Sequence, residues 1–318
     1  MNLLDPGNDL FLTDSTCEQY TVPPLARNAD LSLNEEQNRR LVAHLEMEGI
    51  TNHLYGGNAN FYGLSLRQYA EALELLADLG GEESWFIPSI GPDYGKMTDQ
   101  AVIAKETRFP TFITLPQAFG TTPAGVDKAI RELVQTLARP IILYLKTDPY
   151  LTPDLTARLV DDGQVCGIKY GINRPDSSVD PMLDELVKVV DRDLLIIVGE
   201  RPAVAQHRTF GLGSMMSGSA TLAPAASVAM FAAMKRGDYA TASAIWAAVE
   251  PLEDLRDAIG PITVLHDAVT LTGIAEMGPV LPLVTNLADT YKPVVEKAAK
   301  ALVAYNDSLA WEPVKATA

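Results

Sequence analysis

The segment VCGIKYGIN, residues 165 to 173, places a lysine inside a run that otherwise has the composition of a buried strand. Burial of an ammonium group is costly and shifts the equilibrium of Lys169 toward the neutral amine, the form that attacks a carbonyl carbon. Lys169 is therefore a candidate for Schiff-base catalysis, in which an amine and a substrate carbonyl form an imine. The alternative is a structural lysine whose stem is buried while its head reaches water or pairs with a carboxylate.

The preceding apolar run, PIILYLKTDP, contains Tyr144 and Lys146. In a strand these two alternate with Leu143 and Leu145, so they share one face. If this strand neighbours the one with Lys169, the Tyr144 phenol can relay protons to and from the amine. Lys146 can hold an anionic substrate group or lower the pKa of Lys169 by like-charge repulsion. The structural alternatives are a core tyrosine with a satisfied hydroxyl and a solvated lysine beyond the strand end.

Two further segments have residues suited to binding. LYGGNANFYGLS, residues 54 to 65, is rich in glycine and asparagine and leads from a predicted strand into a predicted helix. Backbone amides at such a turn form an anion site that suits a carboxylate, although most glycine turns are only turns. The hydroxyls of Ser217 and Ser219 can line the mouth of the fold from the last predicted strand, or these small residues can simply leave space.

Eight short apolar runs, each followed by a segment of helical periodicity, position these residues. This alternation is typical of repeated strand and helix units around a parallel sheet. Eight units favour a closed (β/α)8 barrel, or TIM barrel, over an open doubly wound sheet, which usually has fewer strands. Chemistry in such a barrel lies at the carboxyl ends of the strands. The predicted strands are residues 20–25, 49–57, 84–90, 111–116, 140–146, 164–171, 194–199 and 213–220.

Capping signals indicate where several helices begin. Ser32 with Glu35 resembles a capping box. Ser65 precedes LRQYAEALELLADLG, in which apolar residues recur with helical spacing. Thr-Pro pairs that start at residues 122 and 152 open two more helices. These signals therefore support helix starts after several of the predicted strands.

The C-terminal part of the chain, residues 222 to 312, has a helical pattern throughout, which is more helix than a barrel needs. We expect these extra helices to pack on one side of the barrel or to form a subunit interface. The predicted organisation is a barrel with a short N-terminal extension over residues 1–222. The last barrel helix and a C-terminal helical extension follow over residues 223–318.

Composition limits the classes of function. The 318 residues include 25 Lys and Arg against 41 Asp and Glu, and the net charge of −16 disfavours nucleic acid as a partner. No apolar run is long enough to span a membrane and the N-terminus lacks a secretory signal, so we expect no membrane partner and a cytoplasmic location. Cys17 and Cys166 are too few for a disulfide framework, and the four histidines lack the spacing of a metal site. We therefore expect no structural metal.

Three segments together resemble one known family. GGNANFYGLS resembles the GTTGE-type segment, ILYLKTDP the strand with a catalytic tyrosine, and GIKYG the segment with the Schiff-base lysine of the dihydrodipicolinate synthase and N-acetylneuraminate lyase superfamily. LPQAFGTTPAG is similar to the family's strand-four loop, IIVGE to its seventh strand and GSMMSGSATLAP to its last strand. The segments follow the family's order, and the resemblance spans residues 20 to 300.

The resemblance implies a (β/α)8 barrel with C-terminal helices that assembles as a homo-oligomer, a tetramer or a dimer. It implies that pyruvate or another small 2-oxo acid binds covalently as an imine, with no separate cofactor. Lys169 is then the imine-forming residue and Tyr144 the proton shuttle. Gly57, Asn58 and Ala59 align with the glycine and the two threonines that bind the substrate carboxylate.

Departures from the family pattern argue against dihydrodipicolinate synthase activity itself. Both carboxylate-binding threonines are replaced. The strand-four loop has Ala118 and Phe119 in place of a tyrosine pair, and Pro149 or Tyr150 stands where the synthase has an arginine. The candidate substrate-binding residues besides the carboxylate loop are Lys146, Phe119 and Ser219.

We therefore predict a lyase that acts on a 2-oxo acid through an imine at Lys169. A protonated imine at C2 stabilises a carbanion at C3, so either the C3–C4 bond or a C3 proton can be lost. Aldol cleavage or condensation and dehydration of a 2-oxo-3-deoxy sugar acid share this step, and both remain open. A second class is a non-catalytic barrel that binds a keto acid. A metal-dependent aldolase is disfavoured because the histidines, at positions 44, 53, 207 and 266, do not cluster in the sequence.

Overall fold

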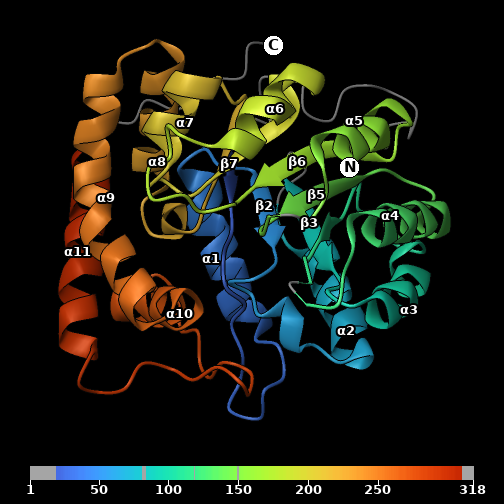
Figure 1. The fold of residues 1–318 in the computed structure, drawn as a ribbon. Coiled ribbons are helices and arrows are strands. Elements are labelled where there is room, and N and C mark those ends of the chain that lie inside the picture. Colours follow the sequence, from blue (N-terminus) through green and yellow to red (C-terminus); the bar gives the residue numbers. More distant parts are fainter. Residues whose placement is uncertain (1–18, 81–83, 118, 149, 310–318) are drawn as a thin grey trace, which may run out of the picture. The chain divides into compact units, whose positions relative to one another are not determined.

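The computed structural model describes residues 19–80, 84–117, 119–148 and 150–309. Its eight strands pair in parallel in the order β1 to β8 and close into a barrel (Figure 1). The predicted (β/α)8 barrel with C-terminal helices is confirmed. Three residues named in the sequence analysis, Cys17, Ala118 and Pro149, lie outside the described part of the chain.

The strands are shorter than the apolar runs that predicted them. The last predicted strand, residues 213–220, is wrong at its end, because a 3-10 turn, η3 (Ser219–Thr221), begins where the backbone of Gly218 turns helical (φ −78, ψ −43). The strand bounds are β1 Gln19–Thr21, β2 Asn52–Tyr55, β3 Trp85–Ile90, β4 Ile113–Thr114, β5 Ile141–Leu145, β6 Val165–Tyr170, β7 Leu195–Val198 and β8 Ser214–Ser217.

An α-helix follows every strand, and three more helices extend the chain. The helix bounds are α1 Glu35–Met47, α2 Leu66–Asp78, α3 Tyr94–Ala104, α4 Pro123–Leu137, α5 Pro153–Asp161, α6 Pro181–Val189, α7 Ala203–Phe210, α8 Pro224–Lys235, α9 Tyr239–Ile259, α10 Pro261–Leu271 and α11 Lys292–Ser308. Two further 3-10 turns are η1 Phe61–Gly63 and η2 Arg192–Leu194.

Three of the predicted capping signals are confirmed and one is wrong. The Ser65 hydroxyl accepts a hydrogen bond from the first turn of α2, and Thr122 and Thr152 are the N-caps of α4 and α5. The capping box predicted at Ser32 does not form, because Asn34 caps α1. The Ser32 hydroxyl instead donates a hydrogen bond to the carboxylate of Asp30, within the polar run that precedes the helix.

Contacts along the chain divide it into two compact units. Unit 1 comprises Leu64–Ala77 and Phe86–Met216, and thus α2, β3 to β7, most of β8 and α3 to α7. Unit 2 comprises Gln19–Gly63, the described part of Asp78–Trp85, and the chain from Ser217, and thus β1, β2, α1 and α8 to α11.

Unit 1 is organised around the adjacent strands β5 and β6, in which Tyr144 pairs with Lys169. The next residue along β6, Tyr170, donates its hydroxyl hydrogen bond to Asp180, which caps α6, so Tyr170 points toward the helices. Because successive side chains in a strand point to opposite faces, Lys169 points into the barrel, and so does its cross-strand partner Tyr144. The strand register therefore places Tyr144 and Lys169 on the same face of the sheet, toward the interior of the barrel.

Unit 2 carries the C-terminal helices, of which α9 and α11 run side by side (Figure 1). The helical pattern predicted throughout residues 222–312 is interrupted between α10 and α11. Two prolines in this stretch, Pro279 and Pro282, lack the N–H that a helix requires. The loop is held instead by Asp267, whose carboxylate accepts hydrogen bonds from Asn286 and from the backbone of Leu287, both at 2.6 Å.

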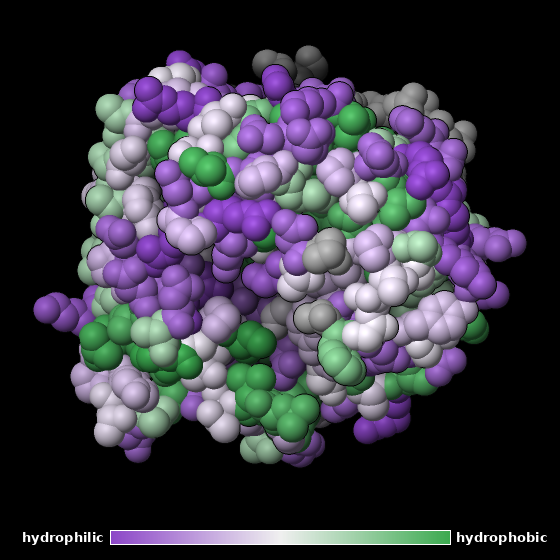
Figure 2. Space-filling view, in the orientation of Figure 1, coloured by the Kyte–Doolittle hydropathy of each residue, from purple (hydrophilic) through white to green (hydrophobic). Residues whose placement is uncertain are grey.

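One face of the molecule is mainly polar. Figure 2 shows polar side chains, in purple, over most of one face, with apolar side chains, in green, in separate patches between them. The net charge of −16 agrees with this surface. No helix in the described ranges is both long and apolar enough to cross a membrane.

Candidate active site

Lys169 is a buried lysine on β6 of unit 1. Its side chain is 6% exposed, and the flanking Ile168 and Tyr170 are almost fully buried. Strand register places it between Tyr144 on β5 and Ile196 on β7. The strands on both sides fix the backbone of Lys169. Only a rearrangement of its side chain can therefore bring the amine to water.

Burial is the main cause of the unusual acidity of this lysine. Desolvation, and to a lesser extent the positive charge of Lys146, lower the pKa of Lys169 to about 7. The Nζ atom lies over the Tyr144 ring, 4.5 Å from its centroid, and the π face of the ring opposes part of this effect because it attracts an ammonium. A large fraction of the amine is therefore neutral, and nucleophilic, near neutral pH.

The Tyr144 ring is held by its backbone and by a glycine. Its backbone N–H donates a hydrogen bond to Thr114 Oγ1 on β4 (3.2 Å). The ring itself lies against Gly171, where a Cβ would come within 2.8 Å of Cε2 and 3.2 Å of the hydroxyl oxygen. A side chain at position 171 would therefore displace the ring from the amine of Lys169.

The loops after β5 and β6 are linked by one ionic network. The guanidinium of Arg174 lies 2.8 Å from the carboxylate of Asp148 and 3.0 Å from that of Asp180. Asp180 is fully buried, accepts the Tyr170 hydroxyl at 2.7 Å and caps the first turn of α6. Hydrogen bonds to both carboxylates raise the pKa of Arg174 above its ordinary value, so its charge is permanent. The network fixes the chain segments that follow Tyr144 and Lys169.

Lys146 lies one residue beyond the end of β5 and is exposed. The sequence placed its side chain on the same face as Tyr144, and strand alternation no longer controls it past Leu145. Its positive charge nevertheless acts on Lys169 and is the second cause, after burial, of the lowered pKa of that amine.

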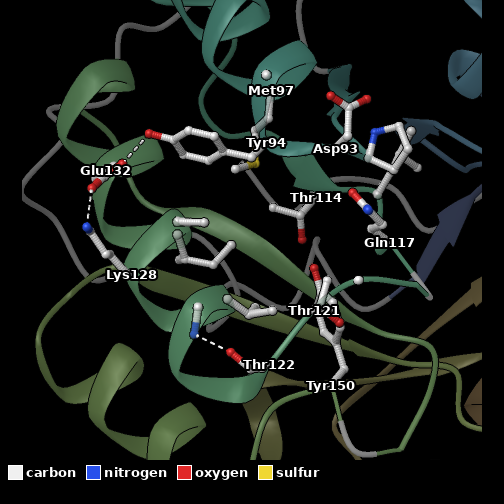
Figure 3. A pocket seen from close by; sticks show the side chains of 18 residues that line it. Asp93, Tyr94, Met97, Thr114, Gln117, Thr121, Thr122, Lys128, Glu132 and Tyr150 are labelled. Atoms are coloured by element: carbon white, nitrogen blue, oxygen red, sulfur yellow. Dashed lines mark hydrogen bonds and ion pairs between the residues drawn. The ribbon is translucent and has the colours of Figure 1, made fainter.

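A groove of about 570 Å³ lies between α3 and α4, next to the end of β4 (Figure 3). Tyr94 and Glu132 bridge the two helices by a hydrogen bond of 2.5 Å, and Thr114 and Tyr150 also line the groove (Figure 3). Neither Lys169 nor Tyr144 is among its lining residues, so the groove and the buried amine are separate features. Thr114 on β4 lines the groove and also accepts the hydrogen bond from the Tyr144 backbone.

Phe119, predicted to bind substrate, is 87% exposed and does not line the groove. Its carbonyl accepts a hydrogen bond from the side chain of Gln117 at 2.7 Å, which holds the backbone of this loop while the ring faces solvent. The prediction that Phe119 binds substrate therefore concerns a side chain that is largely exposed to solvent.

In unit 2 the predicted carboxylate loop follows β2. Asn60 has a left-handed backbone conformation (φ 54), at the position where a GTTGE-type segment has its second glycine. Its N–H donates to the carbonyl of Gly57 at 2.9 Å, so Gly57 to Asn60 form a tight turn. Ala59 is buried, and the Asn58 side chain donates to the carbonyl of Val22 at 2.7 Å. The predicted carboxylate loop is therefore a tight turn whose Asn58 side chain is bound to the backbone.

Ser219 lies in the same unit, fully buried in η3, where its hydroxyl donates to the carboxylate of Glu253. Glu253 also pairs with Arg256 at 2.5 Å. The Arg256 guanidinium in turn donates to Asn58 Oδ1 at 3.4 Å. Two predicted substrate-binding residues, Asn58 and Ser219, are therefore connected through an ion pair on α9.

Residues 114–302 match the family model described as Dihydrodipicolinate synthetase family, which covers more than half of the chain. The chain belongs to this family. The match contains Tyr144 and Lys169 as well as Ser219, and it leaves out the loop with Gly57 to Ala59. The sequence matches no curated protein.

Several solved structures share the fold at low sequence identity. A dihydrodipicolinate synthase from Oceanobacillus iheyensis is 20% identical with a TM-score of 0.81, over 96% of this chain and 100% of that one. A prophage protein of the family from E. coli K12, in complex with pyruvate, is 16% identical with a TM-score of 0.75, over 91% and 98%. A sialic acid aldolase from Ruminococcus gnavus is 13% identical with a TM-score of 0.78, over 92% and 99%. The chain is a divergent member of the Dihydrodipicolinate synthetase family.

The sequence analysis missed several residues of these networks, among them Gly171, Arg174, Glu253 and Arg256. The spacing of Glu253 and Arg256 predicts a helical ion pair, but no local signal connects either residue with Asn58, 198 positions away from Arg256. The close approach of Gly171 and Tyr144 likewise depends on strand pairing.

Within residues 19–80, 84–117, 119–148 and 150–309, no group of three or more His, Cys, Asp or Glu side chains could hold a metal ion. Cys166, beside the site on β6, has its pKa raised to about 11, chiefly by burial. Its thiol is therefore protonated at neutral pH and unsuited to act as a nucleophile.

Proposed function

We propose that this chain is a lyase that acts on a 2-oxo acid through an imine at Lys169. The observation that carries the proposal is the buried amine on β6, whose pKa is lowered to about 7. Membership of the Dihydrodipicolinate synthetase family supports it, since relatives of the same fold include an aldolase and a protein in complex with pyruvate.

The proposed reaction begins when the neutral Nζ of Lys169 attacks the C2 carbonyl carbon and the carbonyl oxygen takes up a proton. Loss of water from the resulting carbinolamine gives a protonated imine. The imine accepts the electron pair released at C3, either from a C3–C4 bond that breaks or from a C3–H bond that loses its proton. Tyr144 is the proposed proton carrier, because its ring lies against the amine.

The substrate carboxylate is proposed to bind the backbone amides of Gly57, Asn58 and Ala59, at the turn that follows β2. Aldol cleavage or condensation and dehydration both proceed from the same imine, so product analysis distinguishes them. As in the family pattern, we expect the active form to be a homo-oligomer, a tetramer or a dimer, which light scattering measures.

Reductive trapping tests the imine directly. The protein is treated with pyruvate and borohydride, and then with a panel of larger 2-oxo acids, and the labelled peptide is identified by mass spectrometry. We expect a reduced adduct on Lys169 that is absent from Lys169→Ala and unaffected by EDTA. Turnover that EDTA abolishes, without a reduced adduct on Lys169, would indicate a metal-dependent enzyme instead.

Lys96→Ala is the matched control, because Lys96 is a half-buried lysine of unit 1 whose pKa is also lowered by burial. It should leave the labelling of Lys169 unchanged. The absence of any adduct with the whole panel would overturn the proposal and favour a non-catalytic barrel that binds a keto acid.

A further inference from the structure

Unit 2 contains a nearly buried ion pair that the proposed chemistry does not use. The side chains of Arg256 and Glu253, both on α9, are 9% and 12% exposed and lie 2.5 Å apart. Ser219 also donates its hydroxyl hydrogen bond to Glu253. Withdrawing such a pair from water costs about as much free energy as the pairing returns, so stability alone does not account for it.

The guanidinium is fixed from several sides. It lies against Gly218, where a Cβ would be 2.8 Å from both terminal nitrogens and 3.0 Å from Cζ. Its Nε atom donates to the carbonyl of Pro261 at 3.4 Å, and one terminal nitrogen donates to Glu253. The remaining terminal nitrogen is directed toward Asn58. Arg256 therefore presents one donor group to the loop after β2.

The Asn58 side chain is held by this donor at one end and, at the other, by the backbone of the residue that follows β1. Its Oδ1 accepts from Arg256 at 3.4 Å, and its Nδ2 donates to the carbonyl of Val22 at 2.7 Å. A guanidinium can only donate and a carbonyl can only accept, so the two partners determine which end of the amide is oxygen. Both ends of the Asn58 amide are therefore engaged by other parts of unit 2.

We propose that Arg256 is a positioning residue, which holds Asn58 so that the backbone amides of Gly57, Asn58 and Ala59 face the substrate carboxylate. This inference rests on the proposed function, in which those amides bind a 2-oxo acid. In this family member the ion pair on α9 stabilises a turn that lacks the two threonines of the family motif.

Gly218→Ala tests the inference with little risk to the fold. The backbone of Gly218 is already helical, a conformation that alanine adopts freely, and the atoms in the way belong to the movable end of Arg256. We expect the variant to fold with a lower melting temperature, because the displaced guanidinium weakens its buried ion pair with Glu253. The pyruvate concentration for half-maximal borohydride labelling of Lys169 should rise about tenfold, with little change in the maximal labelling rate.

The doubly substituted Arg256→Met/Glu253→Met removes both charges and avoids leaving one of them buried alone. It should raise the half-maximal pyruvate concentration as Gly218→Ala does. Adding Asn58→Ala to it should cause no further rise, because residues that act as one unit are not additive. A purely structural role for the pair would give additive effects instead.

The control is Lys300→Met/Glu296→Met, which removes an exposed ion pair on α11 of the same unit and should change neither constant. An unchanged half-maximal concentration in Gly218→Ala and in the α9 double variant would overturn the positioning role while leaving the imine proposal intact. Absence of labelling in the unmodified protein would instead overturn the proposed function, and the positioning role with it.

Discussion

Gly171 leaves the space that the Tyr144 ring occupies. A Cβ at this position would lie 2.8 Å from the ring carbon Cε2 and 3.2 Å from the hydroxyl oxygen. The amine of Lys169 lies over the face of the same ring, with its Nζ atom 4.5 Å from the ring centroid. The absence of a side chain at Gly171 thus allows the Tyr144 phenol to take its position beside the amine of Lys169.

Gly171→Ala should slow the labelling of Lys169 by pyruvate and borohydride about tenfold to a hundredfold, because a displacement of catalytic groups by about 1 Å has effects of this size. The added methyl group must push the Tyr144 ring away from its present contact. Single-turnover labelling at saturating pyruvate measures the rate, and thermal unfolding monitors the fold.

Gly95→Ala, in the first turn of α3, is the matched control. A Cβ there meets its nearest atom at 3.5 Å, an ordinary contact, and alanine is a better helix former than glycine. It should leave the labelling rate unchanged and raise the free energy of unfolding by up to about 1 kcal/mol. An equal labelling rate in Gly171→Ala and the unmodified protein would show that the position of the ring does not matter.

The rate of imine formation should rise with pH around a midpoint near 7. Only the neutral amine attacks the carbonyl, and burial together with Lys146 lowers the pKa of Lys169 to about 7. Labelling with pyruvate and cyanoborohydride between pH 5.5 and pH 8.5 gives the midpoint.

Lys146→Met removes the second of these causes and should raise the midpoint. The shift should be less than about one pH unit, since Lys146 is exposed and solvent screens its charge. A midpoint that moves downward, or one near the pKa of an ordinary lysine in the unmodified protein, would contradict the assignment.

The local parts of the fold follow from the sequence. Period-two and apolar runs locate the strands, and Ser65, Thr122 and Thr152 mark helix starts, because these preferences act over a few residues. The pairing of Tyr144 with Lys169 is also predictable, since consecutive strands of a parallel barrel are neighbours.

Features that depend on distant parts of the chain do not follow. The contact between Asn58 and Arg256 joins residues 198 positions apart, and no periodicity encodes it. The exposure of Phe119 depends on the path of a loop, which strand alternation does not govern. The loop before α11 is set by prolines and by Asp267, so a helical pattern of apolar residues was misleading there.

Lys169→Met should raise the free energy of unfolding most strongly below pH 7. The pKa of Lys169 is about 7 in the folded chain and near 10.5 in the unfolded chain, so the unfolded state binds more protons between these values. The destabilising effect of the buried ammonium is complete below pH 7 and is relieved as the pH rises toward 10.5.

The stability difference between Lys169→Met and the unmodified protein should therefore shrink by about 1.4 kcal/mol per pH unit between pH 7 and pH 10. Urea unfolding at pH 6.0 and pH 9.5 measures it. A difference that is the same at both values would mean that the folded and unfolded pKa values of Lys169 coincide.

Asp180→Ala should lower the free energy of unfolding by about 2–4 kcal/mol. Asp180 is fully buried, and its carboxylate caps α6, pairs with Arg174 and accepts the Tyr170 hydroxyl. The substitution leaves a guanidinium and a buried phenol without this partner. Urea unfolding at pH 7 measures the loss.

Asp93→Ala separates the cap from the network. Asp93 caps α3 in the same way, accepting from the backbone of Lys96 at 2.9 Å, but it is exposed. Its removal should cost about 1 kcal/mol. The excess in Asp180→Ala measures what Arg174 and Tyr170 contribute to holding the loop after β6. Equal losses in the two variants would reduce Asp180 to an ordinary helix cap, and the chain that follows Lys169 would then owe its position to the strand pairs alone.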